Sequence, residues 1–381
     1  MGRDLQFVLK VAERCNIDCT YCYYLNSGND SPFSRPAFMD EQVARGVVDF
    51  ALKSQDTIEV GKIRIVLHGG EPLMLKKKRF RGLCNVLSEL QRAGLDSEIA
   101  MTTNAMLVDE EWIDIFAEYQ IGVGISLDGP QEYHDLERVD FRGRGTHSRV
   151  MFGVNALLKA AAQGQIKQPG VLAVIDPRGK GDVVYDYLIR QLGFRNADFM
   201  MPFTIHDWNP KEEDVNAVAR FLIAAFWEWV KDDNPKIRIR TFNKYLNRIL
   251  ACESEKDRNP DHIVVGVGSD GTIVNDDIMQ VLGPDIFDRG LNVCKSSMDE
   301  YLAELQVGKV AGVAELAQDC KDCYMLDVCR PSTLPWDAAE MRYKKETGFQ
   351  NRLVHCSAIQ DLVGEMQAYV ASQRVPLSIG A

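Results

Sequence analysis

Short apolar runs alternate with amphipathic stretches along the first two thirds of the chain. The apolar runs are rich in Val, Ile and Leu at consecutive positions, which is typical of parallel strands buried on both faces. Strands are expected at residues 5–12, 62–67, 97–102, 121–127, 170–175 and 197–203. The intervening stretches repeat apolar residues at helical spacing, and helices are expected at 40–54, 77–94, 109–118, 147–164, 182–192 and 211–231.

Six strand–helix units in this order predict an α/β fold, a partial (β/α)6 TIM-like barrel over residues 1–235. Asp40 is expected to cap the first long helix, with the carboxylate of Glu41 in its first turn. The polar stretch 231–235 is the expected boundary, and residues 236–381 are expected to form a second domain. A chain of 381 residues is too long for one ordinary compact domain, which agrees with this division.

Composition and charge limit the classes of partner that the chain is expected to bind and the compartment in which it is expected. The net charge of −11 argues against nucleic acid, whose binding needs a clustered basic surface. The short basic run at 76–79 is interpreted as the solvated start of a helix. No apolar stretch reaches the length of a membrane span. The first expected strand begins near the N-terminus, and no signal peptide is expected before it. The ten cysteines are therefore expected in a reducing cytoplasmic compartment, as cluster ligands and free thiols.

Three cysteines, Cys15, Cys19 and Cys22, follow the first expected strand and define the cysteine loop. The spacing C-x3-C-x2-C places three thiolates in one tight loop. A [4Fe–4S] cluster has four irons, so three protein ligands leave one iron open to a small molecule. The alternatives are a zinc knuckle or three unrelated core cysteines.

A second group near the C-terminus has the pattern C-x2-C-x5-C with one distant cysteine, and we call it the C-terminal cysteine set. Four thiolates complete a closed ligand set, which suits a structural or electron-transfer cluster. A zinc ribbon fits the same pattern and stays an alternative. The set consists of Cys320, Cys323, Cys329 and Cys356.

Four further stretches lie where an expected strand runs into its loop, which is where α/β barrels place their chemistry. They are HGGEP at 68–72, MTTN at 101–104, SLDG at 126–129 and LAVI at 172–175. Together with the cysteine loop, and in this order, they resemble the signature of the radical SAM enzymes.

The resemblance implies that S-adenosylmethionine binds the open iron through its amino and carboxylate groups. Tyr21, just before the last cysteine of the loop, can offer a ring face to the adenine. The residues implied are Gly69, Gly70 and Glu71 for the amino group, Thr103 and Asn104 for the ribose region, Ser126 and Arg138 for the carboxylate, and Val174 and Ile175 for the adenine.

The C-terminal cysteine set is similar to the SPASM extension of radical SAM enzymes that modify peptides. The full extension has seven cysteines and two auxiliary clusters. Here Cys252 stands where the isolated cysteine belongs, the next expected position falls in 273–277 without a cysteine, and Thr333 replaces another. The resemblance therefore implies two [4Fe–4S] clusters in all, one binding S-adenosylmethionine and one auxiliary, with Cys84, Cys252 and Cys294 free.

The stretches GSDGTIVNDDI at 268–278 and MPFTIHDW at 201–208 resemble the radical SAM/SPASM maturases that install cyclophane cross-links in ribosomally made peptides. The implied reaction begins with a 5′-deoxyadenosyl radical, which takes a hydrogen from the substrate, and the carbon radical then attacks an aromatic ring. Asp207 or His206 is the candidate base for the released proton, and either can instead be a solvated loop residue. The auxiliary cluster is the implied electron acceptor.

The implied partners are a ribosomally made precursor peptide and an electron donor such as flavodoxin or ferredoxin. A leader-binding domain is not expected before the first strand, so recognition is expected from this chain or from a separate leader-binding protein. Other reactions on the same scaffold remain open, namely sulfatase maturation, thioether formation and epimerisation. A further alternative is an iron–sulfur sensing module that is no enzyme.

Overall fold

The sheet organises the molecule, for which a computed structural model describes residues 2–28, 30–251, 262–274, 281–283, 288–306, 316–330 and 339–373. Ten strands form one sheet in the order β10-β9-β8-β1-β2-β3-β4-β5-β6-β7. The strands are β1 (Arg3–Ala12), β2 (Val60–Gly69), β3 (Ser97–Thr103), β4 (Gly122–Ser126), β5 (Gly170–Val174), β6 (Asn196–Met200), β7 (Arg238–Ile239), β8 (His262–Val267), β9 (Thr272–Val274) and β10 (Asp288–Asn292).

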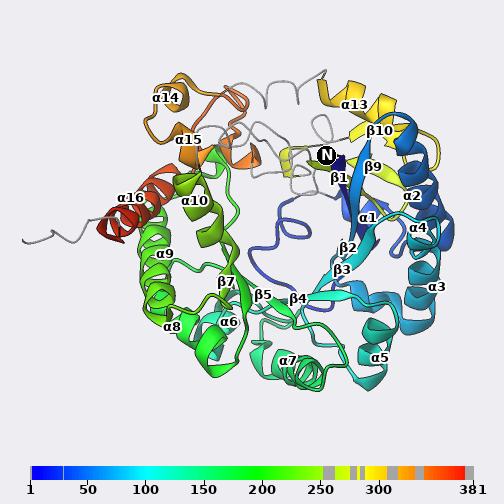
Figure 1. Ribbon diagram of the computed structural model, residues 1–381, viewed down its shortest axis with the longest axis horizontal. Coiled ribbons are helices and arrows are strands. Elements are labelled where there is room, and N and C mark those ends of the chain that lie inside the picture. The colour runs from blue at the N-terminus through cyan, green and yellow to red at the C-terminus, as the bar shows by residue number, and fades with distance from the viewer. Residues whose placement is uncertain are drawn as a thin grey trace, which may run out of the picture.

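Strands β1 to β7 are parallel neighbours in chain order, and they curve into an open arc with helices on its outer side (Figure 1). The six strands expected from the sequence correspond to β1–β6, which confirms the partial α/β barrel. The helices of the barrel are α1 (Ser31–Ser34), α2 (Glu41–Lys53), α3 (Lys77–Leu87), α4 (Glu89–Arg92), α5 (Glu110–Glu118), α6 (Gln131–Glu137), α7 (His147–Ala162), α8 (Gly181–Tyr185) and α9 (Glu212–Asp232).

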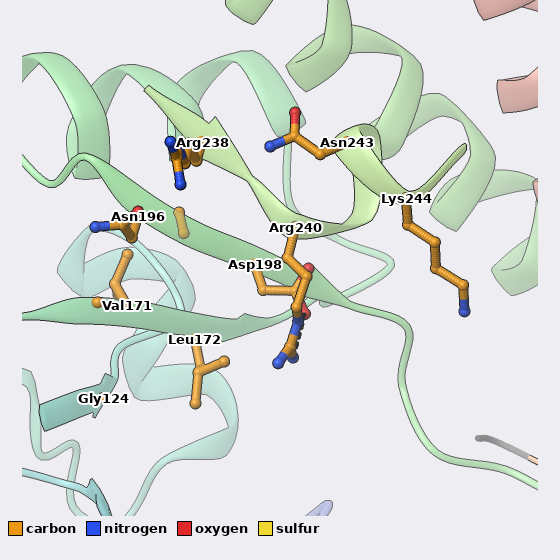
Figure 2. A pocket seen from close by; sticks show the side chains of 11 residues that line it. Gly124, Val171, Leu172, Asn196, Asp198, Arg238, Arg240, Asn243 and Lys244 are labelled. Atoms are coloured by element: carbon orange, nitrogen blue, oxygen red, sulfur yellow. Dashed lines mark hydrogen bonds and ion pairs between the residues drawn. The ribbon is translucent and has the colours of Figure 1, made fainter. Parts of the chain in front are cut away.

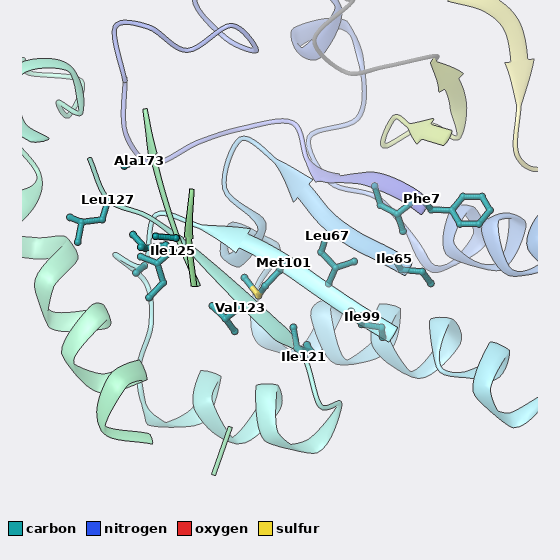
Figure 3. Packing of buried hydrophobic residues seen from close by; sticks show 14 of the residues in the cluster. Phe7, Ile65, Leu67, Ile99, Met101, Ile121, Val123, Ile125, Leu127 and Ala173 are labelled. Atoms are coloured by element: carbon teal, nitrogen blue, oxygen red, sulfur yellow. The ribbon is translucent and has the colours of Figure 1, made fainter. Parts of the chain in front are cut away.

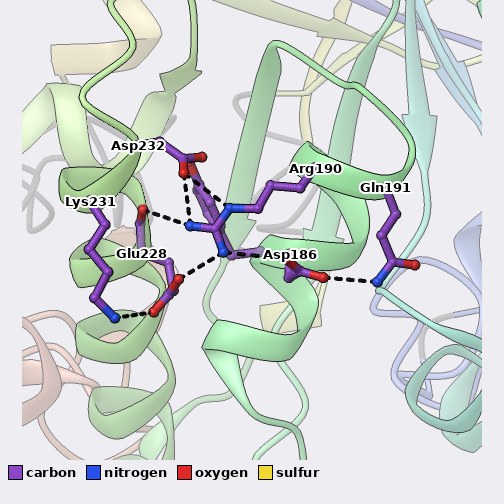
Figure 4. A network of polar contacts seen from close by, with 7 residues as sticks. Asp186, Arg190, Gln191, Glu228, Lys231 and Asp232 are labelled. Carbon is purple, nitrogen blue, oxygen red and sulfur yellow. Dashed lines mark hydrogen bonds and ion pairs between the residues drawn. The ribbon is translucent and has the colours of Figure 1, made fainter.

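Two expected helices are interrupted in the structure. The expected helix 77–94 is divided into α3 and α4 at Ser88, whose hydroxyl donates a 2.7 Å hydrogen bond to the Cys84 carbonyl and so competes with the backbone. The expected helix 182–192 begins as α8 and continues as a π-helical segment, η3 (Asp186–Gln191). Arg190 of η3 binds Glu228 and Asp232 of α9 and joins the two helices on their solvent side (Figure 4).

The helix starts follow the sequence closely. The Asp40 carboxylate accepts a 2.9 Å hydrogen bond from the backbone N–H of Val43, which confirms it as the N-cap of α2. The basic run at 76–79 begins α3, as expected. Lys77 there forms ion pairs with Asp109 (2.5 Å) and Glu111 (2.9 Å) at the start of α5.

The core lies between the sheet and the outer helices. Alternate residues of each strand point toward the helices and are buried, among them Phe7, Leu67, Met101 and Ile125 (Figure 3). Cys84 belongs to the same core, on α3, which confirms its expected place as a small buried hydrophobe. The residues between them in sequence face the inside of the arc, because side chains alternate across a strand.

The sheet continues beyond the expected boundary at residue 235. β7 adds to the edge beside β6, and β8 pairs in parallel with β1 at the opposite edge. The antiparallel strands β9 and β10 then extend that edge. The division into domains 1–235 and 236–381 therefore stays a prediction, and strands from both ranges share one sheet.

The C-terminal helices lie near the two edges of the arc. They are α10 (Arg240–Leu250), α13 (Met298–Gln306), α14 (Gln318–Lys321), α15 (Leu326–Cys329) and α16 (Cys356–Gln373). α16 packs on α9, where the Trp227 indole donates to Glu365 at 3.2 Å and the ring of Phe226 meets that of Tyr369. Among the described residues, no helix is both long and apolar enough to cross a membrane.

Candidate active site

The cysteine loop lies inside the arc of the sheet, directly after β1 (Figure 1). Backbone hydrogen bonds tie it across the barrel, from Asp18 to the carbonyl of Val139 (2.8 Å) and from Thr20 to that of Glu137 (3.0 Å). Cys19 is buried, while Cys15 and Cys22 are half-buried. The loop is thus fixed at the end of α6, a helix that the sequence pattern did not predict.

Burial dominates the electrostatics of the three thiols. It raises the pKa of Cys15 to about 12 and that of Cys19 to about 11, and it raises the pKa of Cys22 as well. The Arg138 guanidinium, 4.0 Å from the Cys19 sulfur, acts in the opposite direction on Cys19. A cation beside buried thiolates suits ligands that must lose their protons to bind metal.

Two glycines at the end of β2 lie close to the segment that leads from β1 into the cysteine loop. A Cβ on Gly70 would overlap the carbonyl oxygen of Arg14, and one on Gly69 would overlap that of Ala12. Gly69 also has a φ of +135°, a conformation that favours glycine. Backbone N–H groups at Gly70 and Glu71 donate to the carbonyls of Ala12 (2.7 Å) and Arg14 (2.9 Å).

The Glu71 side chain connects this loop to the one after β3. Its carboxylate accepts hydrogen bonds from the Thr103 hydroxyl (2.7 Å) and from the backbone N–H groups of Asn104 (2.8 Å) and Leu73 (3.1 Å). Glu71 is 1% exposed, and burial raises its pKa to about 7. The carboxylate therefore holds two loops together, and the cofactor contacts predicted for Glu71 and Thr103 remain predictions.

Asn104 lies beside the cysteine loop, and its contact with the ribose region stays a prediction. Its amide nitrogen is 2.7 Å from the side-chain oxygen of Asn16 and 3.9 Å from the Cys15 sulfur. Its amide oxygen accepts from the backbone N–H of Met106 at 3.0 Å, which holds the side chain in this orientation.

Asp128 is a central residue of the site that the sequence reasoning passed over. Its carboxylate accepts from the Tyr21 hydroxyl (2.6 Å), from the Arg138 guanidinium (2.8 Å) and from the backbone N–H of Val174 (2.9 Å). The Arg138 guanidinium also lies 5.4 Å from the centre of the Tyr21 ring. We call these four residues the Asp128 junction. It joins the cysteine loop, α6 and β5 at one buried point.

The remaining predicted contacts lie on two neighbouring strands. Ser126 ends β4 and pairs with Leu172 of β5. Ser126 and Val174 are half-buried, whereas the Ile175 side chain is 1% exposed and belongs to the core under the helices. Any contact of Ile175 with the adenine would therefore involve its backbone, since its side chain packs away from the inside of the arc.

A second buried polar group beside the cysteine loop was also missed. The Lys10 ammonium, at 1% exposure, lies 3.0 Å from Nδ1 of His68 and 4.2 Å from the centre of the Tyr24 ring. Glu13 is fully buried and accepts from the Tyr24 hydroxyl and from the Ser269 backbone N–H. The signal in the sequence is a lysine inside the otherwise apolar run 7–12.

His206 and Asp207 lie on η4 (His206–Trp208), where both bind the C-terminal segment. Nε2 of His206 is 2.8 Å from the Arg352 carbonyl, and the Asp207 carboxylate accepts from the Lys345 backbone N–H at 2.8 Å. Asp207 is exposed and His206 half-buried. The role of either residue as a base remains a prediction.

The C-terminal cysteine set lines one cavity of about 330 Å³ between α14, α15 and the start of α16. Burial raises the pKa of Cys329 to about 12. The fully buried Arg342 lies near Cys320, and Arg352 lies near Cys356. Four thiols around one space with cations beside them suit an anionic cluster. Cys252, Thr333 and positions 275–277 lie outside the described residues.

Among the described residues, no three His, Cys, Asp or Glu side chains converge as the ligands of one metal ion do. A tetrahedral zinc site with Zn–S bonds of about 2.3 Å brings its sulfurs to about 3.8 Å from one another. In a [4Fe–4S] cluster each cysteine binds a different iron, so the sulfurs need not converge on one point. Donor type and number in both cysteine groups fit a cluster, and they also fit the zinc alternatives.

Comparison with known proteins agrees with this geometry. Residues 9–163 match the family model described as the Radical SAM superfamily. A cysteine-type anaerobic sulfatase-maturating enzyme of Clostridium perfringens is 26% identical over 264 residues, covering 66% of this chain and 67% of that one. A serine-type enzyme of Bacteroides thetaiotaomicron is 32% identical over 152 residues, covering 40% of this chain and 36% of that one.

Solved structures show the same fold. A histidine-tagged anSMEcpe with bound AdoMet has a TM-score of 0.78 at 21% identity, with 98% of each chain covered. Native anSMEcpe with bound AdoMet and Cp18Cys peptide also has a TM-score of 0.78, at 20% identity, covering 97% of this chain and 98% of that one.

The chain is an enzyme that matches the Radical SAM superfamily over residues 9–163, which include the cysteine loop. It is related to the anaerobic sulfatase-maturating enzymes, with which it shares the whole fold and sequence over part of its length. Enzymes of the Radical SAM superfamily need S-adenosylmethionine and a [4Fe–4S] cluster, and the cysteine loop remains the predicted source of the cluster ligands.

Proposed function

We propose that this chain is a maturase of a ribosomally made peptide, and that it forms an intrapeptide carbon–carbon cross-link to an aromatic ring, a cyclophane. The main observation in support of radical chemistry is the Asp128 junction, which fixes the cysteine loop against the inner face of the barrel. A peptide substrate is supported by the related structure that is described with a bound peptide.

The two cysteine groups and the buried carboxylates of the site would have different roles. The cysteine loop would hold the cluster that binds S-adenosylmethionine, and the C-terminal cysteine set would hold an auxiliary cluster. When bound, the first cluster and S-adenosylmethionine supply a 5′-deoxyadenosyl radical that removes a hydrogen atom from the substrate. The buried Asp128 junction and the Glu71 carboxylate would keep the surrounding loops rigid and exclude water from this radical.

The cross-link balances as a two-electron oxidation of the peptide. One hydrogen atom leaves an sp³ carbon to 5′-deoxyadenosine, and the new carbon–carbon bond forms to the aromatic ring. The ring then loses one proton and one electron to regain aromaticity. Asp207 or His206 is our candidate for the proton, and the C-terminal cysteine set provides the site for an electron acceptor.

The cross-link is favoured by the resemblance of residues 268–278 and 201–208 to cyclophane maturases. In the structure, aromatic rings extend from the cysteine loop to η4: Tyr23 lies 6.0 Å from Phe203, which lies 5.4 Å from Trp208. Such rings provide faces against which a substrate aromatic residue can stack. Trp208 is 46% exposed and so can be reached by a peptide.

A second candidate is oxidation of a cysteine or serine in a sulfatase. It is favoured by the relatives, which are named as cysteine-type and serine-type sulfatase-maturating enzymes. It uses the same first hydrogen abstraction and also removes two electrons, but it yields an aldehyde and no new ring.

Mass spectrometry of a precursor peptide from a neighbouring reading frame, co-expressed with the enzyme, separates these products. The cross-link predicts a loss of two hydrogens, a segment that resists proteolysis, and no reaction with hydrazide. An aldehyde from serine also loses two hydrogens but reacts with hydrazide, and a thioether consumes a cysteine thiol. An unchanged mass with altered stereochemistry would identify epimerisation and overturn the cross-link.

A prior assay tests whether the chain is an enzyme or a sensing module. The reconstituted and reduced protein is expected to convert S-adenosylmethionine to 5′-deoxyadenosine. Flavodoxin or ferredoxin is the proposed physiological donor, and a separate leader-binding protein is the proposed route to recognition. A reduced, cluster-loaded protein that makes no 5′-deoxyadenosine with or without peptide would contradict the proposal.

A further inference from the structure

A cavity of about 530 Å³ lies on strands β4 to β7 and α10, and its lining is strongly basic (Figure 2). The lining includes Arg238 at the start of β7 and Arg240 and Lys244 on α10. Among the described lining residues the sole carboxylate is Asp198 of β6. Two guanidinium groups, of Arg238 and Arg240, therefore face one carboxylate in a protein whose net charge is −11.

Residues at the start of α10 already bind the Asp198 carboxylate. Its carboxylate binds the Arg240 guanidinium (2.5 and 2.7 Å) and accepts from the Thr241 hydroxyl (2.5 Å) and backbone N–H (3.1 Å). Figure 2 shows the Arg240 and Asp198 side chains lying against each other. Within the described residues, the Arg238 side chain forms no ion pair. Because Asp198 is bound by Arg240 and Thr241 at the start of α10, it leaves the positive charge of Arg238 uncompensated among the described residues.

Two glycines keep the cavity open. Gly124 and Gly170 line it, and neither has a positive φ. A Cβ on Gly124 would meet its nearest neighbour, the Met101 carbonyl oxygen, at 3.4 Å, and one on Gly170 would meet the Asn196 carbonyl oxygen at 3.5 Å. These are ordinary contacts, so neither backbone geometry nor crowding demands glycine here. The missing side chains leave space on the inner face of the sheet.

The cavity adjoins the predicted cofactor contacts on that same face. Gly124 is two residues before Ser126 on β4, and Leu172 is two residues before Val174 on β5. Residues two apart on a strand share a face and are roughly 7 Å apart along it. A ligand in the cavity would therefore lie roughly 7 Å along the sheet from Ser126 and Val174, the residues predicted to contact the cofactor.

We propose that this cavity binds carboxylate side chains of the peptide substrate, next to the residue that reacts. The inference rests on the proposed function, since it takes the substrate to be a peptide. Guanidinium groups bind carboxylates through paired, charge-assisted hydrogen bonds, and Arg238 provides such a fork. A carboxylate anchored there would fix the register of the peptide relative to the reacting carbon.

Calorimetric titration of the reconstituted holoenzyme, saturated with S-adenosylmethionine, tests this. The probes are N-acetyl-triglutamate amide, N-acetyl-triglutamine amide and free succinate. We expect triglutamate to bind at least about tenfold more tightly than triglutamine, and its binding to weaken with added salt, because charge pairs in a cavity open to solvent are screened. Saturation with the cofactor ensures that its own carboxylate site is filled.

One variant and a control assign the effect to the cavity. Arg238→Gln should weaken triglutamate binding roughly fivefold or more, the effect of losing about 1 kcal/mol, and leave triglutamine binding unchanged. Lys159→Gln, on the exposed outer side of α7, should change neither. Equal affinity for the two peptides, no effect of Arg238→Gln, or succinate binding as tightly as triglutamate would overturn the inference.

The same preparations separate this inference from the proposed function. If the reduced holoenzyme forms 5′-deoxyadenosine but does not distinguish the two peptides, the function stands and the carboxylate site is wrong. If it distinguishes them and forms no 5′-deoxyadenosine, the anionic preference of the cavity stands and the function is wrong. Circular dichroism of each variant shows whether it folds as the parent does.

Discussion

Replacing Asp128 by alanine should be among the most destabilising single changes in the barrel. The substitution removes a carboxylate that is 6% exposed and that accepts three hydrogen bonds, from Tyr21, Arg138 and Val174. It also leaves the Arg138 guanidinium, 7% exposed, without its ion-pair partner. Breaking a buried ion pair by removing one partner typically costs about 3–5 kcal/mol.

Variants with smaller changes than Asp128→Ala separate the contributions to this loss of stability. Tyr21→Phe removes one hydrogen bond to a charged acceptor, which is worth roughly 1.5–3 kcal/mol. Asp128→Asn keeps the shape but loses the charge, and should lie between the two. Arg64→Gln is the control, because its ion pair with Glu98 is largely exposed and is worth at most about 1 kcal/mol.

The assay is urea unfolding of the metal-free protein followed by circular dichroism, so that cluster binding does not add to the measured stability. A double-mutant cycle with Tyr21→Phe and Asp128→Asn should show that the two losses are not additive, since both remove the same hydrogen bond. A cost below about 1 kcal/mol for Asp128→Ala, equal to the Arg64→Gln control, would refute the structural role of the junction.

Three further predictions concern the cofactors and the pH dependence of stability. Alanine at all three positions of the cysteine loop should leave about four irons per chain and abolish 5′-deoxyadenosine formation; residual formation would contradict the ligand assignment. Cys356→Ala should lower the iron content by about four atoms per chain, while Cys294→Ala leaves it unchanged; equal iron in both variants would reject the auxiliary site. Because burial raises the pKa of Glu71 from 4.5 to about 7, the folded state holds its proton more tightly. Relative to Glu71→Gln, the wild-type protein should therefore lose up to roughly 3 kcal/mol of unfolding free energy as pH rises from 4.5 through 7. Parallel stability curves for the two proteins would show that Glu71 does not titrate in this range.

The sequence predicts the parts of the fold that depend on local pattern. The six barrel strands, the N-cap at Asp40 and the start of α3 all follow from spacing and residue type within a few positions. The cysteine loop is equally local. What the sequence reasoning missed depends on contacts between distant segments: β8 pairs with β1, and its six residues carry no sign of which strand they will join.

The same distinction holds within the site. Asp128 lies in the stretch SLDG at 126–129, yet its partners lie on the cysteine loop, α6 and β5, so its role appears only in three dimensions. Ile175 belongs to a stretch whose neighbour Val174 is on the opposite face, and pattern alone does not tell which of the two faces the cofactor. The basic cavity is likewise assembled from four strands and a helix.

The pairing of β1 with β8 has a consequence for how this protein is made. Leu5 pairs with Ile263, so one edge of the N-terminal strand has no partner until that residue has left the ribosome. At roughly 5–20 residues per second, about 255 residues take roughly 13 to 50 s to synthesise. During that time an apolar strand exposes an unpaired backbone edge, which is a template for pairing with other nascent chains. Fragments that end before β8 should therefore aggregate on expression, and slow growth or chaperone supply should raise the yield of the intact enzyme.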